Sequence, residues 1–480
     1  MSNPSTHAAA RQVYARYRAI VPDWNAFLDS LSRPLATTVW AHPWRIGRER
    51  LRPLLAEAGI ETTPVPWHPQ ALRMPEGVGA GAHWGLAAGL YQPQEEVAMV
   101  PVTLLDPQPG ERVLDMCAAP GNKTAQIAVA MNNTGTVHAN EVQKGRLAAL
   151  RRTVKRLGLA NVTVTLAPGQ DLSLRNGPFD RVLVDAPCSG EGIWRKGRGE
   201  RGQRALQIAD DAMRERLARR QRQLLTRAVR LAAVGARIVY STCTIAPEEN
   251  EAVVDAVLRA FPGRLRVRPA RLPGVNASAG VTAWSGVEYD EAVAGTARVW
   301  PHQNDTGGFY VAVLEKVDGV ETHGDHAPPP AGDSSELAAL AERFGLAEAA
   351  VEGLTVVAGS GRYLQLASAD HRLPPALEVQ STGLPVVGLQ ARPPKPTTAA
   401  AMALGAGAAR NCLDLDAGEL AAFMRREPLT RTPGALGRIG SRGYVLVRHR
   451  GFGIGVACTR GALDRPEVSL ASLYPKAWGV

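Results

Sequence analysis

Between residues 112 and 260, short apolar runs alternate with stretches of helical periodicity. The runs predict strands at 112–115, 136–140, 162–166, 181–184 and 236–240. The other stretches predict helices at 125–131, 144–157, 211–233 and 247–260. Strands separated by helices of this length form βαβ units, so the pattern predicts an α/β fold with a parallel, doubly wound sheet. We place this domain at residues 101–316.

The chain is too long for one hydrophobic core, because 480 residues exceed the length at which chains divide into domains. We expect an N-terminal accessory region at 1–100, a flexible Pro-rich linker at 317–336 and a C-terminal accessory region at 337–480. The accessory regions contain predicted helices at 13–27, 397–404 and 417–424 and a β-like run at 443–448. A small α+β module is therefore expected after the linker.

The chain is strongly basic, with a net charge of +10 and a pI of about 9.6. This balance suits a polyanionic partner, because Lys and Arg release counterions from phosphate on binding. Only seven of the 55 basic residues are lysines. Arginine suits RNA because it binds phosphate through two donors and stacks on bases, although a genome-wide preference for Arg codons would give the same ratio. Residues 195–230 hold twelve basic residues against four acidic ones, which indicates either an RNA contact or a solvated helix face.

Composition also bears on the compartment. No run of 18 uncharged apolar residues occurs, and the first residues lack the basic-then-apolar pattern of a signal peptide. We expect a cytoplasmic protein without a membrane partner. Five cysteines, none at the spacing of a zinc site, favour reduced thiols and no bound metal.

Two of these cysteines stand in short, distinctive motifs. Cys188 belongs to DAPCSGEG at 185–192, and Cys243 belongs to YSTCT at 240–244. Each follows an apolar run, and residues just past the carboxyl ends of parallel strands line the crevice where open α/β sheets bind ligands. Both thiols are therefore expected at one site, although a cysteine at a strand end often serves only in packing. We expect a packing role for the other three: Cys117, Cys412 and Cys458.

The segment 113–124 passes from a strand through a loop of small residues into the start of a helix. Small residues let a backbone approach a ligand, and a helix N-terminus offers free N–H groups to a carboxylate or phosphate. The spacing matches neither the Walker loop nor the Gly-x-Gly-x2-Gly dinucleotide fingerprint. Glu141 follows at the end of the next strand, about 20 residues further on, where an acid commonly binds ribose hydroxyls. An ordinary surface glutamate would fit the same position.

Three motifs together carry a family resemblance: CAAPGNKT at 117–124, DAPCSGEG at 185–192 and STCTIAPEEN at 241–250. In this order they resemble the signature set of the Nop/Sun family of RNA cytosine-5 methyltransferases, and in particular its bacterial RsmF type. The resemblance extends to residues 91–94, 298–302 and 306–309, and the ending at 473–476 is similar to the close of RsmF-type chains. It implies a Rossmann-like S-adenosylmethionine-dependent methyltransferase domain with accessory RNA-binding regions, the C-terminal one PUA-like.

The resemblance also implies site residues. Seven would wrap the cofactor, S-adenosyl-L-methionine: Cys117, Ala118, Ala119, Pro120, Gly121, Asn122 and Lys123. Glu141 would hold the ribose, Asp171 is the best candidate for the adenine, and Asp185 would lie between the cofactor and the target base. Cys243 would be the nucleophile, and Cys188 would help to release the product. The family usually has glycine in place of Asn122, but asparagine tolerates a positive φ better than most residues.

The implied activity is methylation of carbon 5 of cytosine in RNA, with 16S rRNA or the small ribosomal subunit as the expected partner and a monomer as the expected state. Transfer RNA is an alternative substrate, because the same active site would serve it. A DNA cytosine-5 methyltransferase would use Cys188 as its nucleophile, and the presence of Cys243 in a loop of its own favours the RNA class. The third alternative is a non-catalytic RNA-binding factor in ribosome assembly.

Overall fold

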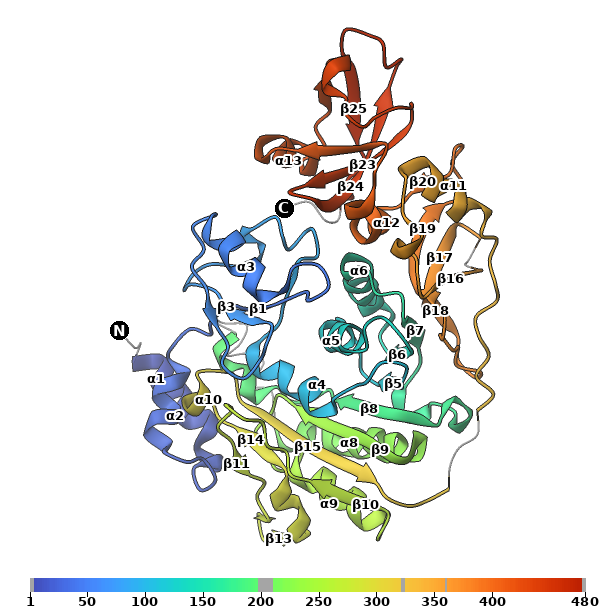
Figure 1. Cartoon of the computed structure of the whole chain (residues 1–480). Coiled ribbons are helices and arrows are strands. Elements are labelled where there is room, and N and C mark those ends of the chain that lie inside the picture. Colours follow the sequence, from blue (N-terminus) through green and yellow to red (C-terminus); the bar gives the residue numbers. More distant parts are fainter. Residues whose placement is uncertain (1–3, 197–209, 321–323, 359–360, 477–480) are drawn as a thin grey trace.

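A ten-stranded sheet forms the centre of the molecule (Figure 1). The computed structural model describes residues 4–196, 210–320, 324–358 and 361–476, and all structural statements concern these residues. The central strands run in the order β9 (Ala232–Thr242), β8 (Phe179–Asp185), β5 (Arg112–Asp115), β6 (Thr136–Glu141) and β7 (Val162–Leu166), all parallel to their neighbours. The chain therefore starts in the middle and winds outward in both directions. This arrangement confirms the predicted doubly wound α/β fold and opens a crevice at the carboxyl ends of β5 and β8.

Antiparallel strands extend the sheet beyond this parallel core. On one side β15 (Phe309–Lys316) pairs with β9, and β10 (Leu265–Arg268), β14 (Ala297–Val299) and β11 (Ser278–Ala279) continue from it. On the other side β18 (Val379–Thr382) pairs with β7. The sheet thus includes a strand from beyond residue 336, the far end of the expected linker. Inside the expected linker, His326 Nε2 lies 3.1 Å from the carbonyl oxygen of Gly177 in the α/β domain. The domain is therefore contacted by a residue of the linker as well as by strand β18, which follows the linker.

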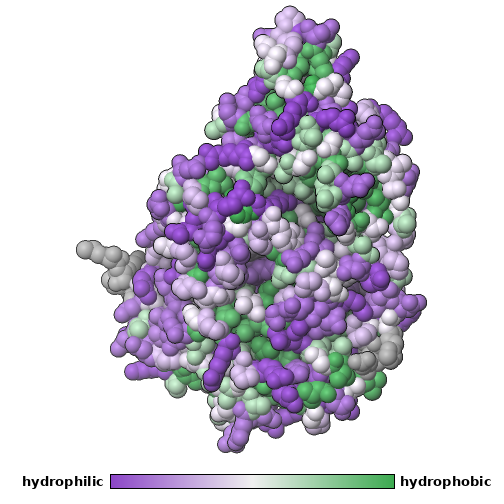
Figure 2. Space-filling model, viewed as in Figure 1, coloured by the Kyte–Doolittle hydropathy of each residue, from purple (hydrophilic) through white to green (hydrophobic). Residues whose placement is uncertain are grey.

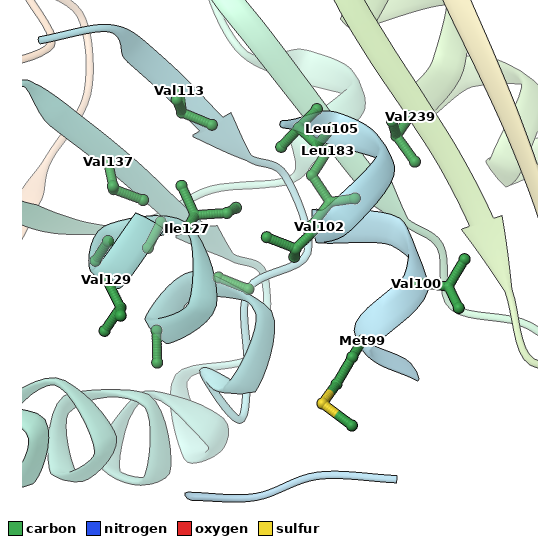
Figure 3. Packing of buried hydrophobic residues seen from close by; sticks show 14 of the residues in the cluster. Met99, Val100, Val102, Leu105, Val113, Ile127, Val129, Val137, Leu183 and Val239 are labelled. Carbon is green, nitrogen blue, oxygen red and sulfur yellow. The ribbon is translucent and has the colours of Figure 1, made fainter. Parts of the chain in front are cut away.

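Helices cover both faces of the sheet. Side chains alternate between the faces of a strand: Val113, Leu183 and Val239 belong to one buried cluster, while Leu114 and Ile238 belong to another. The first cluster includes residues of α4 (Val100–Leu105), α5 (Asn122–Ala130) and α6 (Leu147–Leu157). Figure 3 shows the side chains of α4 and α5 against those of the strands. The second cluster includes α8 (Asp211–Leu231) and α9 (Glu251–Ala260). Each fully buried large apolar side chain contributes about 1.5–3 kcal/mol.

The predicted helix at 247–260 begins later than expected, at Glu251. Asn250 explains the difference, because its Nδ2 donates to the carbonyl oxygen of Thr244 at 3.1 Å and its Oδ1 accepts from Thr242 Oγ1 at 2.6 Å. These bonds hold residues 244–250 as a compact turn after β9. The predicted helix at 211–233 also ends earlier, at Leu231, where β9 begins.

The N-terminal region contains two small units. The helical unit has α1 (Pro4–Tyr14), η1 (Ala15–Tyr17) and α2 (Trp24–Leu31), so the single helix predicted at 13–27 is wrong. Pro22 disfavours helical backbone at Val21, and Asp23 then caps α2 by accepting from the Ala26 N–H. The second unit is a sheet of order β2 (Thr63–Pro64), β3 (Ala71–Arg73), β1 (Thr38–Ala41) and β4 (Tyr91–Pro93), with α3 (Gly47–Ala56).

The C-terminal region is α+β. One sheet has the order β16 (Leu354–Val357), β17 (Tyr363–Ser368), β19 (Leu384–Gly388) and β20 (Lys395–Pro396), with α11 (Ser335–Phe344) and α12 (Thr398–Leu404). The other has the order β21 (Cys412–Leu415), β23 (Tyr444–His449), β24 (Phe452–Arg460), β25 (Val468–Ser472) and β22 (Leu429–Arg431), with α13 (Ala417–Met424). The predicted helices at 397–404 and 417–424 and the strand at 443–448 correspond to α12, α13 and β23. Likeness to a PUA domain stays a prediction.

The remaining short elements are the hairpin β12 (Ala283–Trp284) and β13 (Val287–Glu288) and the helix α10 (Pro301–Asn304). No helix in the described parts of the chain combines the length and apolar character that crossing a bilayer requires. Figure 2 shows hydrophobic residues scattered among hydrophilic ones on the face of Figure 1.

Candidate active site

The two cysteine motifs meet at the carboxyl ends of β8 and β9. These strands are parallel neighbours in which Asp185 lies opposite Ser241, so the residues that follow them emerge side by side. The Sγ atoms of Cys188 and Cys243 are 3.4 Å apart. Both cysteines are free thiols. The structure therefore holds two thiols within hydrogen-bond distance at the edge where an α/β sheet binds its ligand.

Lys123 and Asp185 form an ion pair beside the thiols. Lys123 lies in the first turn of α5, and its Nζ is 2.7 Å from Asp185 Oδ2. Ser241 Oγ donates to the other oxygen, Oδ1, at 2.8 Å. Burial lowers the pKa of Lys123, but attraction to Asp185 outweighs it and raises the pKa overall. The centroid of the Phe309 ring lies 5.7 Å from the ammonium nitrogen, so Ser241 contacts the acid of the pair and Phe309 contacts the cation.

A small cavity of about 130 Å³ opens between these groups. Its lining includes Lys123, Asp185, Cys243, Phe309 and Glu95, together with three glycines. Gly192 N donates to the carbonyl oxygen of Cys243 at 2.8 Å, and Gly308 N donates to the carbonyl oxygen of Gly192 at 2.8 Å. The cavity has room for little more than one ring, and the groups around it include one thiol, two carboxylates and three cationic side chains, those of Lys123, Arg195 and Lys196.

The surroundings shift the pKa values of the two thiols in opposite directions. The hydrogen bond to Cys188 lowers the pKa of Cys243, burial and the charge of Asp185 oppose this shift, and the charges of Lys123 and Lys196 support it. The same hydrogen bond and burial raise the pKa of Cys188, and the charge of Glu249 adds to this. Since the thiolate is the nucleophilic form of cysteine, the arrangement favours Cys243 as the nucleophile and Cys188 as the hydrogen-bond donor.

A second layer of side chains fixes the loop of Cys188. Glu249 Oε2 accepts from the Ser189 N–H at 3.0 Å and from Gln221 Nε2 at 2.8 Å, and Gln221 also donates to the carbonyl oxygen of Pro187 at 2.9 Å. Burial raises the pKa of Glu249, and these hydrogen bonds oppose the shift. The thiol of Cys188 is thereby held by contacts to both of its neighbours in the chain.

The N-terminal helical unit covers the next turn of the same loop. Tyr14 Oη donates to the carbonyl oxygen of Glu191 at 2.5 Å. Arg195, which is almost fully buried, donates to the carbonyl oxygens of Pro34 at 2.7 Å and of Thr306 at 3.0 Å. Segments far apart in the sequence therefore enclose the thiol site.

The loop at 117–123 lies beside this site, at the end of β5. The N–H of Ala118 donates to the carbonyl oxygen of Asn140 at 2.8 Å, and the N–H of Ala119 donates to Glu141 Oε2 at 3.3 Å. Pro120 follows with its carbonyl oxygen 3.2 Å from Thr153 Oγ1. The loop is thus tied to the end of β6 next to it in the sheet.

The helix that follows the loop starts differently from the expectation. Gly121 has the positive φ, at 105°, and Asn122 is the first residue of α5. Asn122 instead bonds to the N-terminal sheet: its Oδ1 accepts from Gln92 Nε2 at 2.7 Å and its Nδ2 donates to the carbonyl oxygen of Pro93 at 3.3 Å. Position 122 therefore does not need a residue that tolerates a positive φ. The side chain of Asn122 makes hydrogen bonds that a glycine could not make.

Of the remaining predicted residues, Glu141 and Cys117 pack into the domain and Asp171 is exposed to solvent. Glu141 is buried at the end of β6, where its Oε1 accepts from the N–H groups of Val142 and Gln143 at 2.9 and 2.8 Å. Cys117 packs against the second buried cluster, and burial raises its pKa. Asp171 is exposed at the end of η5 (Gly169–Asp171). Its neighbour Gln170 has a buried Oε1 that accepts no hydrogen bond from any described residue.

The basic segment 195–230 is only partly described. Arg198, Arg201 and Arg204 lie outside the described residues. In α8, four arginines are exposed to solvent: Arg216, Arg219, Arg222 and Arg230. No group of three or more His, Cys, Asp or Glu side chains that could hold a metal ion is found among the residues that the structure covers.

Sequence reasoning missed Glu95, Ser241 and Glu249 as parts of the site. Ser241 and Glu249 stand inside the motif at 241–250, so their proximity to Cys243 was a usable signal. Glu95 directly follows the segment 91–94, 90 residues before the first cysteine motif begins. Only the folded chain brings Glu95 to Gly307, whose N–H donates to Glu95 Oε1 at 3.0 Å.

A doubly wound sheet with a small-residue loop after β5, a buried acid after β6 and paired thiols after β8 and β9 defines a Rossmann-like methyltransferase domain. A family model described as 16S rRNA methyltransferase RsmB/F matches residues 102–315. The chain belongs to this family of RNA cytosine-5 methyltransferases. The resemblance noted in the sequence is thereby confirmed.

Individual relatives agree with this assignment. A tRNA (cytosine(49)-C(5))-methyltransferase of Pyrococcus abyssi is 34% identical over 313 residues, which cover 64% of this chain and 96% of that protein. Ribosomal RNA small subunit methyltransferase F of Klebsiella pneumoniae is 33% identical over 318 residues, which cover 64% of this chain and 63% of that protein. The solved structure of a methyltransferase homolog from Pyrococcus horikoshii superposes with a TM-score of 0.56 at 28% identity, covering 65% of this chain and 99% of that one.

Proposed function

We propose that this protein transfers a methyl group from S-adenosyl-L-methionine to carbon 5 of a cytosine in small-subunit ribosomal RNA, through a covalent adduct of Cys243. The observation that carries the proposal is the thiol pair: Cys188 and Cys243 lie 3.4 Å apart, and Cys243 lines the small cavity together with Lys123 and Asp185. A single buried thiol would have an ordinary packing role, whereas two thiols with opposite pKa shifts beside an ion pair suit nucleophilic catalysis.

The residues at the ends of β5, β6 and β7 fit the cofactor. The small loop at 117–121 leaves backbone close to the ligand, and the carboxylate of Glu141 can accept from ribose hydroxyls. The unpartnered Oε1 of Gln170 suits the amino group of adenine, with Asp171 next to it at the surface. When bound, S-adenosylmethionine supplies an electrophilic methyl group.

The chemistry explains why a thiol is needed. Carbon 5 of cytosine is a poor nucleophile, and addition of the Cys243 thiolate to carbon 6 makes carbon 5 electron-rich. Asp185 can hydrogen-bond to the edge of the base or, once it carries a proton, protonate it as negative charge develops in the ring. Lys123 holds Asp185 and, through its charge, favours the thiolate of Cys243.

Release of the product reverses the addition. After methyl transfer the proton on carbon 5 leaves, the carbon–sulfur bond breaks, and its electron pair returns to the sulfur of Cys243. Cys188 assists this step, because its sulfur lies 3.4 Å from that of Cys243 and its S–H can donate to the departing thiolate. The target base must be turned out of its RNA stack to reach the cavity.

Ribosomal RNA is proposed on the description of the matching family and on the relative from Klebsiella pneumoniae. Transfer RNA is the second candidate, because the Pyrococcus abyssi relative is named for that substrate and is covered almost entirely by the match. We propose that the accessory regions and the exposed arginines of α8 contact the RNA, and that the protein acts as a monomer.

The test is bisulfite sequencing of total RNA from cells that lack the gene and are complemented by defined variants. Wild type and the control Cys458→Ala should restore methylation at particular ribosomal cytosines, whereas Cys243→Ala should not. In vitro, Cys188→Ala should accumulate a protein–RNA adduct on a denaturing gel. A methylated tRNA cytosine would replace the ribosomal substrate, and unchanged methylation of all RNA with retained RNA binding would favour the assembly factor.

A further inference from the structure

The small cavity contains a second carboxylate that the mechanism does not use. Glu95 directly precedes η3 (Glu96–Met99), and its side chain lines the cavity with Asp185 and Cys243. Glu95 Oε1 accepts from the Gly307 N–H at 3.0 Å and from the Val97 N–H at 3.4 Å. These two bonds fix the orientation of the carboxylate.

The two carboxylates differ in what they can still accept. Both oxygens of Asp185 have donors, Lys123 Nζ at 2.7 Å and Ser241 Oγ at 2.8 Å. In contrast, no described residue donates to Oε2 of Glu95, because the hydrogen bonds to its side chain use Oε1. Among the described residues, the carboxylates that line the cavity therefore leave one oxygen without a donor, on the partly buried side chain of Glu95.

The position of this acceptor is coupled to that of the nucleophile. Glu95 holds Gly307, the next residue Gly308 donates to Gly192, and Gly192 donates to the carbonyl oxygen of Cys243. Three successive hydrogen bonds thus connect the side chain of Glu95 to the backbone of Cys243 by way of the glycines. A ring that meets the sulfur of Cys243 lies within a space that the Glu95 carboxylate also lines.

We propose that Glu95 is a specificity-determining residue that accepts a hydrogen bond from the exocyclic amine of the target cytosine. The inference rests on the proposed function and adds the group that tells cytosine from uracil. Cytosine presents an amine donor at carbon 4, and carboxylates accept from it. Uracil has a carbonyl oxygen there, which would face the open oxygen of Glu95 without a proton between them. A site built to hydrogen-bond one group rejects an analogue that lacks it, because the buried polar group is left unpaired.

The test compares two RNA transcripts that carry a 5-fluoropyrimidine at the mapped target position, 5-fluorocytidine in one and 5-fluorouridine in the other. Fluorine at carbon 5 blocks the final elimination, so each turnover leaves an adduct that a denaturing gel detects. Rates are measured for wild type, Glu95→Gln, Glu95→Ala and the exposed control Glu288→Gln. The glutamine keeps an oxygen for the Gly307 N–H and presents an N–H2 group on the open side.

Glu95→Gln should slow adduct formation with 5-fluorocytidine RNA by about 10- to 100-fold. The rate with 5-fluorouridine RNA should hold or rise, so the preference for cytosine falls by at least about tenfold. Glu95→Ala also loses the contact to Gly307 and should slow both reactions. A preference for cytosine in Glu95→Gln within about threefold of wild type overturns the inference alone, because a structural role would slow both reactions equally. Failure of wild type to form any adduct with 5-fluorocytidine RNA overturns the proposed function as well.

Discussion

Replacing Gly192 by alanine should disable the site through the backbone contact that holds Cys243. An added Cβ would lie 2.1 Å from the carbonyl oxygen of Gly308 and 2.8 Å from that of Cys243. Both are backbone atoms, so neither can rotate away, and the segments must separate. The two hydrogen bonds through Gly192 contribute about 1 kcal/mol each, and overpacking costs about 1–3 kcal/mol more. The expected loss is therefore about 3–5 kcal/mol.

Two measurements check this value. The Tm of a domain of this size falls by about 2–4 °C for each kcal/mol of lost stability, so the Tm of Gly192→Ala should be lower by roughly 6–20 °C. Adduct formation at a temperature where the variant is folded should slow at least about 100-fold, since a displacement of about 1 Å costs that much. Gly434→Ala is the control, because its Cβ would meet nothing within 4 Å. Wild-type activity and Tm in Gly192→Ala would refute the steric reasoning.

Three further predictions concern charged groups. Lys123→Met should raise the pKa of Cys243 by removing a nearby cation, so the pH profile of iodoacetamide alkylation should move to higher pH. Glu251→Gln should cost about 3–5 kcal/mol in urea unfolding, because it leaves the buried guanidinium of Arg298 without its carboxylate. Burial raises the pKa of Asp115 to about 7, so the folded state keeps a proton that the unfolded chain loses near pH 4 and stability falls between these values. Asp115→Asn should therefore stabilise the protein above about pH 7 and have little effect below about pH 4.

The parallel core could be predicted because each of its strands has a local signal. An apolar run bounded by turn residues precedes each helix from Arg112 onward, and β7 has the predicted bounds. Strand β18 has no such signal: Val379–Thr382 is a short polar run, and it becomes a strand only because β7 offers an unpaired edge. The break between α1 and α2 had a local signal in Pro22, which the helical periodicity around it masked.

The site could be predicted in part for the same reason. Lys123, Asp185, Cys188 and Cys243 stand at the ends of strands or shortly after them, so topology alone brings them to one edge of the sheet. Glu95 reaches the cavity from the N-terminal region through a contact to Gly307, 212 residues away in the sequence. Such a contact depends on how an accessory unit packs on the domain, and no local pattern encodes it.

The structure adds a physical reason to the proposal that Cys243 is the nucleophile, because Cys188 and Cys243 occupy similar places after neighbouring strands. The hydrogen bond between the two thiols has the largest effect: it lowers the pKa of Cys243 and raises the pKa of Cys188, and the charge of Glu249 raises the pKa of Cys188 further. At Cys243 the charges of Lys123 and Lys196 favour the thiolate, whereas burial and the charge of Asp185 oppose it, and the pKa is lowered overall. Because Lys123 is itself held by Asp185, the cation and the acid that act in opposite directions on Cys243 form one ion pair. The ends of β8 and β9 and the helix start that carries Lys123 thus act together on the protonation of the two thiols, and the proposed choice of Cys243 as nucleophile rests on that arrangement.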